Sequence, residues 1–206
     1  ASAHNVFDAF EEEPFAAASI GQVHRAEFGG RAVAVKVQYP EMADVLASDV
    51  KTVSTLTKFG ALVGQNLKEP IAELRQRMLT ECDYVAEAEN QVLFRQLLAE
   101  RPGAVVPEVI AARSTGRVLC TALEPGLSFE AFNAQATQAE KDKAGGIIFD
   151  ACFHTLFHRC VYNADPHPGN YLFRDGEVVF LDYGCVKHFK PEFIDMWKRM
   201  ALSVID

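Results

Sequence analysis

Three side chains near the C-terminal end of the chain, Asp165, Asn170 and Asp182, have the chemistry that a cation and a hydroxyl group require. Mg²⁺ prefers hard oxygen ligands, and Asp182 and Asn170 offer a carboxylate and an amide oxygen. Asp165 offers a second carboxylate, which could orient or deprotonate an acceptor. Phosphate oxygens neutralised by a cation and an oriented acceptor are the requirements of phosphoryl transfer. The three residues therefore predict a phosphoryl-transfer centre; the alternative is a proline-rich turn in which Asp and Asn only shape the backbone.

A loop and a hairpin are expected to position these side chains. Residues 161–170 contain two prolines and one glycine, so neither a helix nor a strand should continue through them. Two short apolar strands are predicted next, at 171–173 and 178–181, joined by the turn pair Asp175-Gly176. A hairpin of this kind would return the aspartate that follows it to the neighbourhood of the loop.

The spacing of these residues matches two motifs of protein kinases. Asp165 precedes Asn170 by five residues, as the Asp and Asn of a kinase catalytic loop do, and an Asp-Tyr-Gly triplet beginning at Asp182 stands where kinases have Asp-Phe-Gly. Lys36 ends Val-Ala-Val-Lys, which is similar to Val-Ala-Ile-Lys, whose lysine contacts the α- and β-phosphates of ATP. A lone strand lysine is usually a solvated edge residue, but the downstream catalytic loop favours the phosphate-binding interpretation.

A small antiparallel sheet is predicted to carry this lysine. Residues 31–38 alternate strictly, so their valines face one side and Lys36 faces the other, and Gly29-Gly30 before them favours a two-residue hairpin. Two further strands are expected at 107–112 and 117–123.

Two helices are predicted between these strands, one over residues 40–67 and one from Pro70. The apolar stripe of the second helix runs through Ile71, Leu74, Met78, Cys82, Val85, Val92 and Leu97. An ammonium group in a partly desolvated cleft needs a carboxylate partner, which a helical glutamate usually supplies. We expect Glu87 to pair with Lys36, with Glu81 as the second candidate.

The remainder of the chain is expected to be mainly helical. A hinge whose backbone groups would read an adenine is predicted at Ala122, Leu123 and Glu124. A polar helix should follow from about Phe129, and residues 141–160 should form a buried, apolar central helix.

A rival constellation lies on the central helix, at Cys152, His154, His158 and Cys160. The two histidines are four residues apart and share a face, which would suit a metal. Cys152 and His154, two residues apart, point in different directions, and no third well-placed ligand is evident. Packed or surface histidines are the simpler interpretation.

Composition excludes several other classes of protein. With 206 residues, 49% hydrophobic, the chain is long enough for one domain or two lobes. A net charge of -8 has the wrong sign for a nucleic-acid groove. Five scattered cysteines favour a reducing, cytoplasmic environment over a disulfide framework, and no apolar run is long enough to span a bilayer. The absence of an initial Met indicates a segment of a longer protein, so membrane association through segments outside this chain stays open.

Over nearly its whole length the chain resembles the UbiB/AarF atypical kinase family. Three stretches carry the likeness: the catalytic loop at 165–170, the alanine-rich run Ala16, Ala17, Ala18 and Ser19 that continues to Gln22 and His24, and a Glu-x-Asp signature at Glu81 and Asp83. Members replace the glycine-rich phosphate loop with this alanine-rich one. Because alanine removes positive-φ conformations and adds a methyl group, a stiffer phosphate loop is expected.

The resemblance implies a nucleotide site, with ATP or ADP and Mg²⁺ as cofactors, ATPase or autophosphorylating activity, and poor activity on proteins. It also implies a role in ubiquinone or other prenyl-lipid metabolism, with lipid, quinone or membrane-associated biosynthetic proteins as further partners. In the family, the Glu-x-Asp pair belongs to an element that occludes the usual protein-substrate cleft.

Three positions in the catalytic loop depart from related patterns. Asn163 stands where many relatives have His, and Ala164 where ordinary kinases have Arg, which removes the usual anchor for a phosphorylated activation loop. His167 occupies the place of the catalytic-loop lysine. It is a candidate donor to the γ-phosphate, with a purely structural role as the alternative.

Together these patterns predict an α+β, two-lobed protein-kinase-like fold. Residues 1–123 would form the N-lobe, with a small antiparallel sheet and helices, and residues 124–206 a partial, mainly helical C-lobe. Lys36, Glu87, Asp165 and His167 are the expected catalytic residues, and Asn170 and Asp182 the metal ligands. Two alternatives remain: a small-molecule kinase of the aminoglycoside or choline type, which shares an Asp-x-His-x-x-Asn loop, and a nucleotide-binding pseudokinase that acts as a chaperone.

Overall fold

The computed structural model describes residues 6–18, 20–40 and 82–205. The chain divides into two compact units, one of residues 1–88 and 109–123 and the other of residues 89–108 and 124–206. Most of the two helices predicted from residue 40 lies outside the described residues, as do Ser19 and Glu81.

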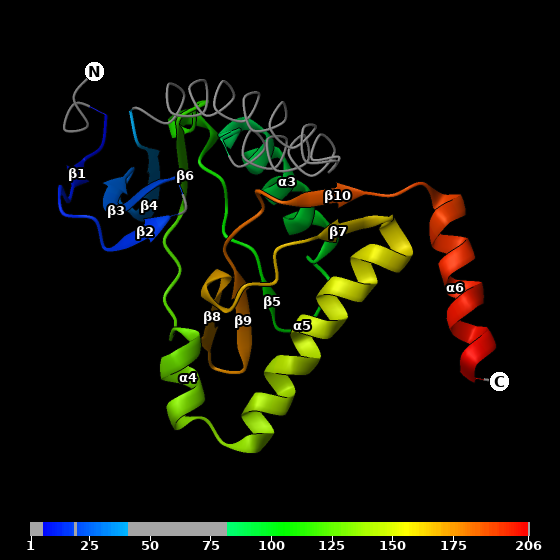
Figure 1. Cartoon of the computed structure of the whole chain (residues 1–206). Helices are drawn as coiled ribbons and strands as arrows, with labels where there is room; N and C mark the ends of the chain where they lie inside the picture. The colour runs from blue at the N-terminus through cyan, green and yellow to red at the C-terminus, as the bar shows by residue number, and fades with distance from the viewer. Residues whose placement is uncertain (1–5, 19, 41–81, 206) are drawn as a thin grey trace, which may run out of the picture. The chain divides into compact units, whose positions relative to one another are not determined.

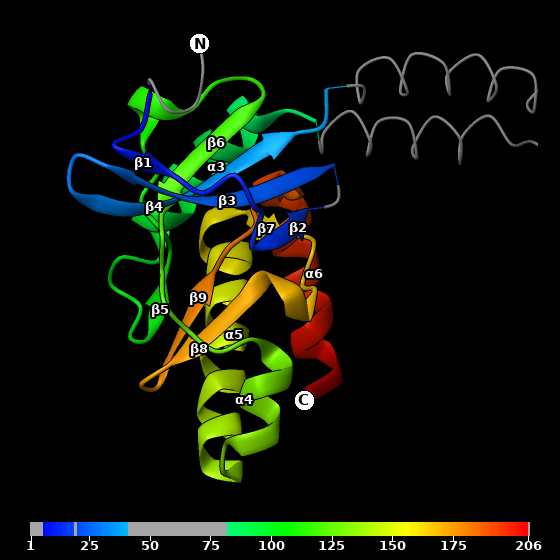
Figure 2. The same cartoon turned by 90° about the vertical axis from the view of Figure 1, so that its left-hand side faces the viewer.

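The first unit is built on a five-stranded antiparallel sheet in the order β1-β3-β4-β6, with β2 paired to β3 (Figure 2). Its strands are β1 (Ala9–Phe10), β2 (Ala16–Ala18), β3 (Gly21–Phe28), β4 (Arg31–Gln38) and β6 (Val118–Ala122). The predicted turn at Gly29-Gly30 is confirmed, with φ of 59° and 71°, values that glycine adopts without strain. The alternation predicted for β4 is also confirmed, because Val33 and Val35 are each 1% exposed.

One predicted strand of this sheet is wrong. Residues 107–112 form no continuous strand: Val109 makes an isolated bridge to Thr121, and a 3₁₀ turn follows at Ala111–Arg113. The Ser114 hydroxyl hydrogen-bonds backbone groups on both sides of this turn: it accepts from the N–H of Cys120 and donates to the carbonyl of Ile110. A side-chain hydrogen bond of this kind replaces the strand ladder locally.

The helix predicted from Pro70, whose start lies outside the described residues, is not continuous to Leu97: α3 spans Tyr84–Leu97 and buries a different face than predicted. Asp83 starts the helix by accepting a hydrogen bond from the Ala86 N–H at 3.0 Å, so no helix runs through residues 82 and 83. Val85 and Val92 from the predicted stripe are 50% and 43% exposed. The buried side chains, spaced three or four residues apart, are Tyr84, Glu87, Gln91, Phe94 and Leu98. The apolar stripe predicted from hydrophobic periodicity is wrong because Glu87 and Gln91, which lie on the buried face, are polar.

The second unit combines helices with two small sheets (Figure 1). Strands β5 (Ala104–Val105), β9 (Glu177–Phe180) and β8 (Tyr171–Arg174) form one sheet, and β7 (Val161–Asn163) pairs with β10 (Val186–His188). Its helices are α4 (Phe129–Gln135), α5 (Gln138–Arg159) and α6 (Pro191–Ile205). Residues 89–108, which sequence placed with the N-lobe, group here because β5 pairs with β9 and because Phe94 and Leu98 join this core.

Residues 161–170 are more ordered than a loop. Val161–Asn163 form β7, antiparallel to β10, and Pro168–Asn170 form a 3₁₀ turn, so the expectation of no regular structure was wrong there. The strand precedes the first proline, and it needs a partner 25 residues later in the chain that no local rule identifies. The hairpin that follows is confirmed: Asp175 and Gly176 have φ of 43° and 77° between β8 and β9.

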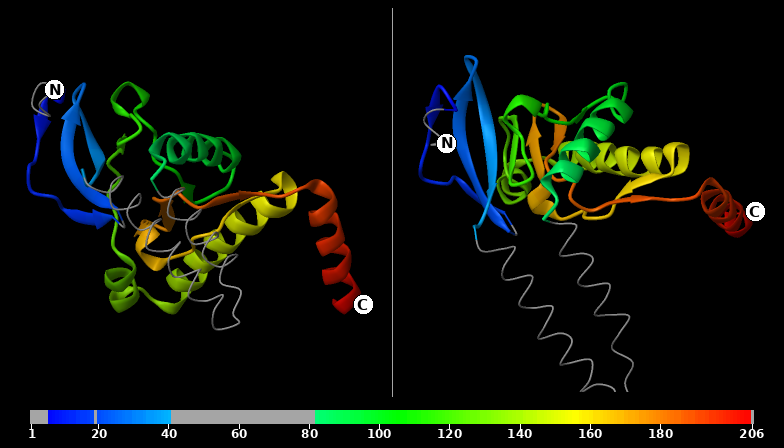
Figure 3. Two further views of the ribbon diagram at one scale, coloured as in Figure 1. Left: turned by 45° about the horizontal axis from the view of Figure 1, so that its top comes forward. Right: turned by 90° about the horizontal axis from the view of Figure 1, so that it is seen from above.

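Helix α5 starts at a capping box formed by Thr137 and Glu140, three residues before the predicted start. It is not buried all round, because Phe149 is 64% exposed, although Ala151 and Leu156 lie inside. Figure 3 shows β10 leading into α6, drawn in red, near the C-terminal end of α5. Phe157 and Trp197 connect the two helices, with ring centroids 5.3 Å apart. None of the helices in the described ranges is both long and apolar enough to cross a membrane.

Candidate functional site

The first unit holds a buried ion pair between β4 and α3. The Nζ atom of Lys36 donates to both carboxylate oxygens of Glu87, at 2.8 and 3.0 Å. The Glu87 side chain is 2% exposed and that of Lys36 is 16% exposed. The pairing expected from the sequence is therefore present. A buried pair is retained only with good geometry, and this bidentate contact supplies it.

Two contacts hold the start of α3 against the sheet beside this pair. The side-chain amide of Gln38 donates to the carbonyl of Cys82 at 2.6 Å, and the Lys36 ammonium lies 5.1 Å from the centre of the Tyr84 ring. Asp83, one half of the predicted family signature, caps the helix through its carboxylate. Sequence reasoning assigned no role to Tyr84; its place three residues before Glu87, on the same helical face, was the available signal.

The alanine-rich segment forms a strand in the described residues. Ala16, Ala17 and Ala18 pair with Val23, Gln22 and Gly21, so β2 and β3 make a tight hairpin. A Cβ atom at Gly21 would collide with the carbonyl oxygen of Val37, which explains why glycine stands at this close crossing of the backbone. Gln22 is therefore placed in the hairpin opposite Ala17. The described part of this segment is paired through its backbone with β3, and its role as a phosphate loop stays a prediction.

Two residues of the hinge predicted at 122–124 make contacts within the protein. The N–H of Leu123 donates to the carbonyl of Ala32 and so extends the pairing of β6 with β4 beyond Ala122. In the second unit, the Glu124 carboxylate pairs with Arg174 at 2.7 Å. The Leu123 N–H is thus used inside the sheet, and contact of this segment with an adenine stays a prediction.

In the second unit, the catalytic-loop residues form a hydrogen-bonded cluster. The Asn170 amide nitrogen donates to Oδ2 and to the backbone oxygen of Asp165, at 3.0 and 3.2 Å. The Asn163 amide nitrogen donates to the backbone oxygen of Asp182 at 2.7 Å. The Gly184 N–H donates to the Asp182 carboxylate at 2.8 Å. Asp165, Asn170 and the Asp-Tyr-Gly turn are therefore locally tied together, as the predicted hairpin requires.

Asn163 connects the two halves of this cluster. Its amide nitrogen holds the backbone of Asp182, and its amide oxygen accepts from the Asp165 N–H at 3.4 Å. Sequence reasoning noted this residue only as a departure from relatives. A side chain with one donor and one acceptor group, two residues before Asp165, suits the bridging role.

The donor set of this cluster fits a magnesium ion that also binds phosphate. Asp182 supplies carboxylate oxygen and Asn170 an amide oxygen, since the Asn170 nitrogen is used by Asp165. Mg²⁺ takes its other ligands from water and substrate phosphates, so two protein ligands suffice. The described residues contain no group of three His, Cys, Asp or Glu side chains arranged to hold a metal. The alternative metal site considered at Cys152, His154, His158 and Cys160 is therefore not formed.

His167 has a local structural contact. Its Nδ1 accepts from the Gly169 N–H at 3.1 Å, which caps the 3₁₀ turn that leads to Asn170. This contact fixes the ring beside the loop backbone. A direct contact with a γ-phosphate stays a prediction.

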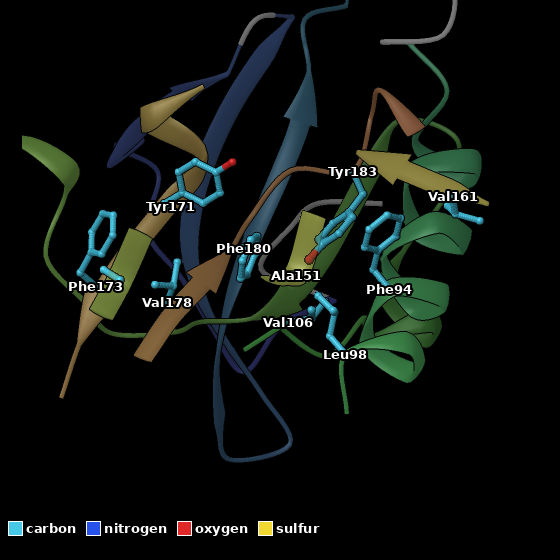
Figure 4. Packing of buried hydrophobic residues seen from close by; sticks show 11 residues of the cluster. Phe94, Leu98, Val106, Ala151, Val161, Tyr171, Phe173, Val178, Phe180 and Tyr183 are labelled. Carbon is cyan, nitrogen blue, oxygen red and sulfur yellow. The ribbon is translucent and has the colours of Figure 1, made fainter. Parts of the chain in front are cut away.

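Tyr183, the middle residue of the Asp-Tyr-Gly triplet, is 1% exposed and packs against Phe94 with ring centroids 5.1 Å apart (Figure 4). Its hydroxyl makes no hydrogen bond with the described residues, and the residue lines a void of about 10 Å³. Burial raises the pKa of this phenol well above its usual range. A buried hydroxyl without a partner costs about 1–3 kcal/mol, so this residue stores a penalty within the motif.

Tyr183→Phe is accordingly expected to raise the free energy of unfolding by about 1 kcal/mol, measured by urea denaturation. Because burial raises the phenol pKa in the fold, only the unfolded chain ionises this group just above about pH 10, which destabilises the wild type but not Tyr183→Phe, so the gain should grow in alkaline buffer. A loss of stability would instead show that the hydroxyl bonds a water in the adjoining void, which is just large enough for one.

These features define a kinase-like fold: an antiparallel sheet with a lysine paired to a helical glutamate, and a loop that groups Asp165, Asn170 and the Asp-Tyr-Gly turn. A solved structure agrees, the complex of Rv3197 with erythromycin from Mycobacterium tuberculosis. It is 32% identical with a TM-score of 0.80, over 90% of this chain and 48% of that one. Residues 1–206 match the ABC1 atypical kinase-like domain, and the chain belongs to this family.

Several relatives of this chain are named as atypical kinases. "Atypical kinase coq-8, mitochondrial" of Caenorhabditis elegans is 34% identical over 97% of this chain and 28% of its own length. "Atypical kinase COQ8B, mitochondrial" of Rattus norvegicus is 34% identical over 95% of this chain and 38% of its length. "Atypical kinase COQ8, mitochondrial" of Saccharomyces cerevisiae is 31% identical over 94% of this chain and 40% of its length. The chain thus spans well under half of these relatives.

Proposed function

We propose that this chain carries the nucleotide site of an atypical kinase or ATPase that uses ATP or ADP with Mg²⁺. The buried, bidentate Lys36–Glu87 pair carries the proposal, because a structural role alone rarely justifies the desolvation of two charges. Such a pair is what a phosphate-contacting kinase lysine requires. Membership of the ABC1 family supports the same conclusion.

Each residue then has a defined part. Glu87 keeps the Lys36 ammonium in one position, from which it donates to the α- and β-phosphates. Asp182 and Asn170 would hold Mg²⁺, which would supply neutralisation of the phosphate charge. Asp165, kept in place by the Asn170 amide, accepts the proton of the attacking hydroxyl or water. Residues 16–19 are expected to cover the phosphates, and backbone groups of residues 122–124 other than the Leu123 N–H are expected to contact the base.

We further propose that the whole protein supports ubiquinone or other prenyl-lipid metabolism, together with lipid, quinone or membrane-associated biosynthetic proteins. The family resemblance and the COQ8 names of the relatives support this role. The net charge of -8 disfavours nucleic acid as a partner.

The decisive experiment is nucleotide hydrolysis by the full-length protein and its Asp182→Asn variant, with and without Mg²⁺. We expect the variant to lose about 100-fold or more of its turnover, because metal affinity falls at least tenfold when even supporting groups are lost. Asp195→Asn is the matched control, since this carboxylate is 69% exposed on α6. Equal turnover of wild type and Asp182→Asn would remove the metal assignment.

The same assay separates the alternatives. Nucleotide-dependent thermal stabilisation without turnover, even in the presence of quinone-containing membranes, would favour a pseudokinase. Rapid phosphorylation of an amino alcohol or aminoglycoside would favour a small-molecule kinase, whose Asp-x-His-x-x-Asn loop this chain also matches at 165–170.

A further inference from the structure

The tip of the alanine-rich hairpin is anchored in the core of the first unit. Ile20, which begins the return to β3, is 7% exposed and clusters with Tyr84 and Leu119. The N–H of Tyr39 donates to the carbonyl of Ile20 at 3.1 Å. Both the side chain and the backbone of this position are therefore fixed, so the hairpin is held at its tip as well as along its strands.

Tyr84 contacts the two parts of the site that would meet phosphate. It clusters with Ile20 at the hairpin tip, and its ring lies 5.1 Å from the Lys36 ammonium. The tyrosine is fully buried, at 0% exposure, and Lys36 is mostly shielded. A cation over an aromatic face gains more energy when it is desolvated than when it is exposed to water.

The start of α3 fixes this tyrosine from the other side. Asp83 caps the helix and Gln38 holds the Cys82 carbonyl, so the two residues that precede the first turn are both attached. Glu87, one turn further, shares the same ammonium. Lys36 is thus held by a carboxylate and a ring from one helical turn.

We propose that Tyr84 is a positioning residue of the nucleotide site, which sets the Lys36 ammonium and the tip of the alanine-rich hairpin together. This inference rests on the proposed function. We expect nucleotide affinity to depend on the aromatic face of Tyr84 and not only on the volume of its side chain. Loss of the ring should allow the lysine and the hairpin to move independently.

The test compares Tyr84→Phe, which keeps the ring, with Tyr84→Leu, which keeps an apolar side chain without it. In the full-length protein, we expect the Kd for ATP and ADP to stay within about twofold for Phe and to rise about 5- to 20-fold for Leu. Val33→Ala is the control, because Val33 is 1% exposed in a separate cluster of the same sheet. It should lower the Tm without changing the Kd.

A second readout does not depend on nucleotide. Hydrogen exchange of the Tyr39 amide, which bonds Ile20, should accelerate about tenfold in Tyr84→Leu beyond the change seen in Val33→Ala. If the wild type binds no nucleotide, the proposed function fails while this exchange still decides whether Tyr84 positions the hairpin. A Tyr84→Leu protein that keeps the wild-type Kd, or one with unchanged relative exchange, would overturn the inference.

Discussion

Glu87→Ala is expected to lower the free energy of unfolding by about 3–5 kcal/mol. The change leaves the Lys36 ammonium mostly buried without its bidentate carboxylate, whose oxygens lie 2.8 and 3.0 Å from Nζ. The cost is therefore mainly the penalty of an uncompensated charge. It should exceed that of any exposed carboxylate on the same helix.

Urea denaturation of Glu87→Ala and Glu89→Ala would measure this difference. Glu89 is exposed on α3 two residues away, so its loss should change stability by less than about 0.5 kcal/mol. The double variant Lys36→Met/Glu87→Leu should recover most of the lost stability, because it removes both charges and fills the space. Equal effects of the two alanine variants would contradict the ion pair as described.

The second large effect is expected from Phe94→Ala, at about 3–5 kcal/mol of unfolding free energy. Phe94 is 3% exposed and packs against the Tyr183 ring, whereas Val92, two residues before it, is 43% exposed. Val92→Ala should cost less than about 0.5 kcal/mol. The pair of variants therefore measures which face of α3 is inside.

The same denaturation curves decide between the two faces. A cost for Val92→Ala greater than that for Phe94→Ala would restore the apolar stripe predicted from the sequence. Phe94→Leu, which keeps apolar volume, should lose clearly less than Phe94→Ala if the effect comes from the cavity.

Features set by neighbouring residues were predicted well. The turns at Gly29-Gly30 and Asp175-Gly176 have the positive φ values that their sequences favour, and the alternation in β4 put its valines inside. Spacing also placed Asp165 beside Asn170, since five residues and a 3₁₀ turn leave little freedom. The carboxylate partner of Lys36 was predicted because an ammonium group in a cleft requires one.

Features set by distant residues were predicted poorly. The strand expected at 107–112 gave way to hydrogen bonds from Ser114, and β7 formed because β10 supplies a partner. The face of α3 was misassigned because Glu87 and Gln91 are polar yet buried. Hydrophobic periodicity places polar residues on the exposed face of a helix. It contains no information on Lys36 of β4, which neutralises Glu87 in the fold.

The sequence by itself determined which groups are available for chemistry and which short turns hold them, because both depend on residue type and nearby spacing. Only the tertiary structure decided which side of α3 is buried, that Asn163 bridges the catalytic loop, and that Tyr84 joins Lys36 to the alanine-rich hairpin. These depend on pairings between segments far apart in the chain. Such pairings are chosen by the summed packing and desolvation of the fold rather than by any local preference.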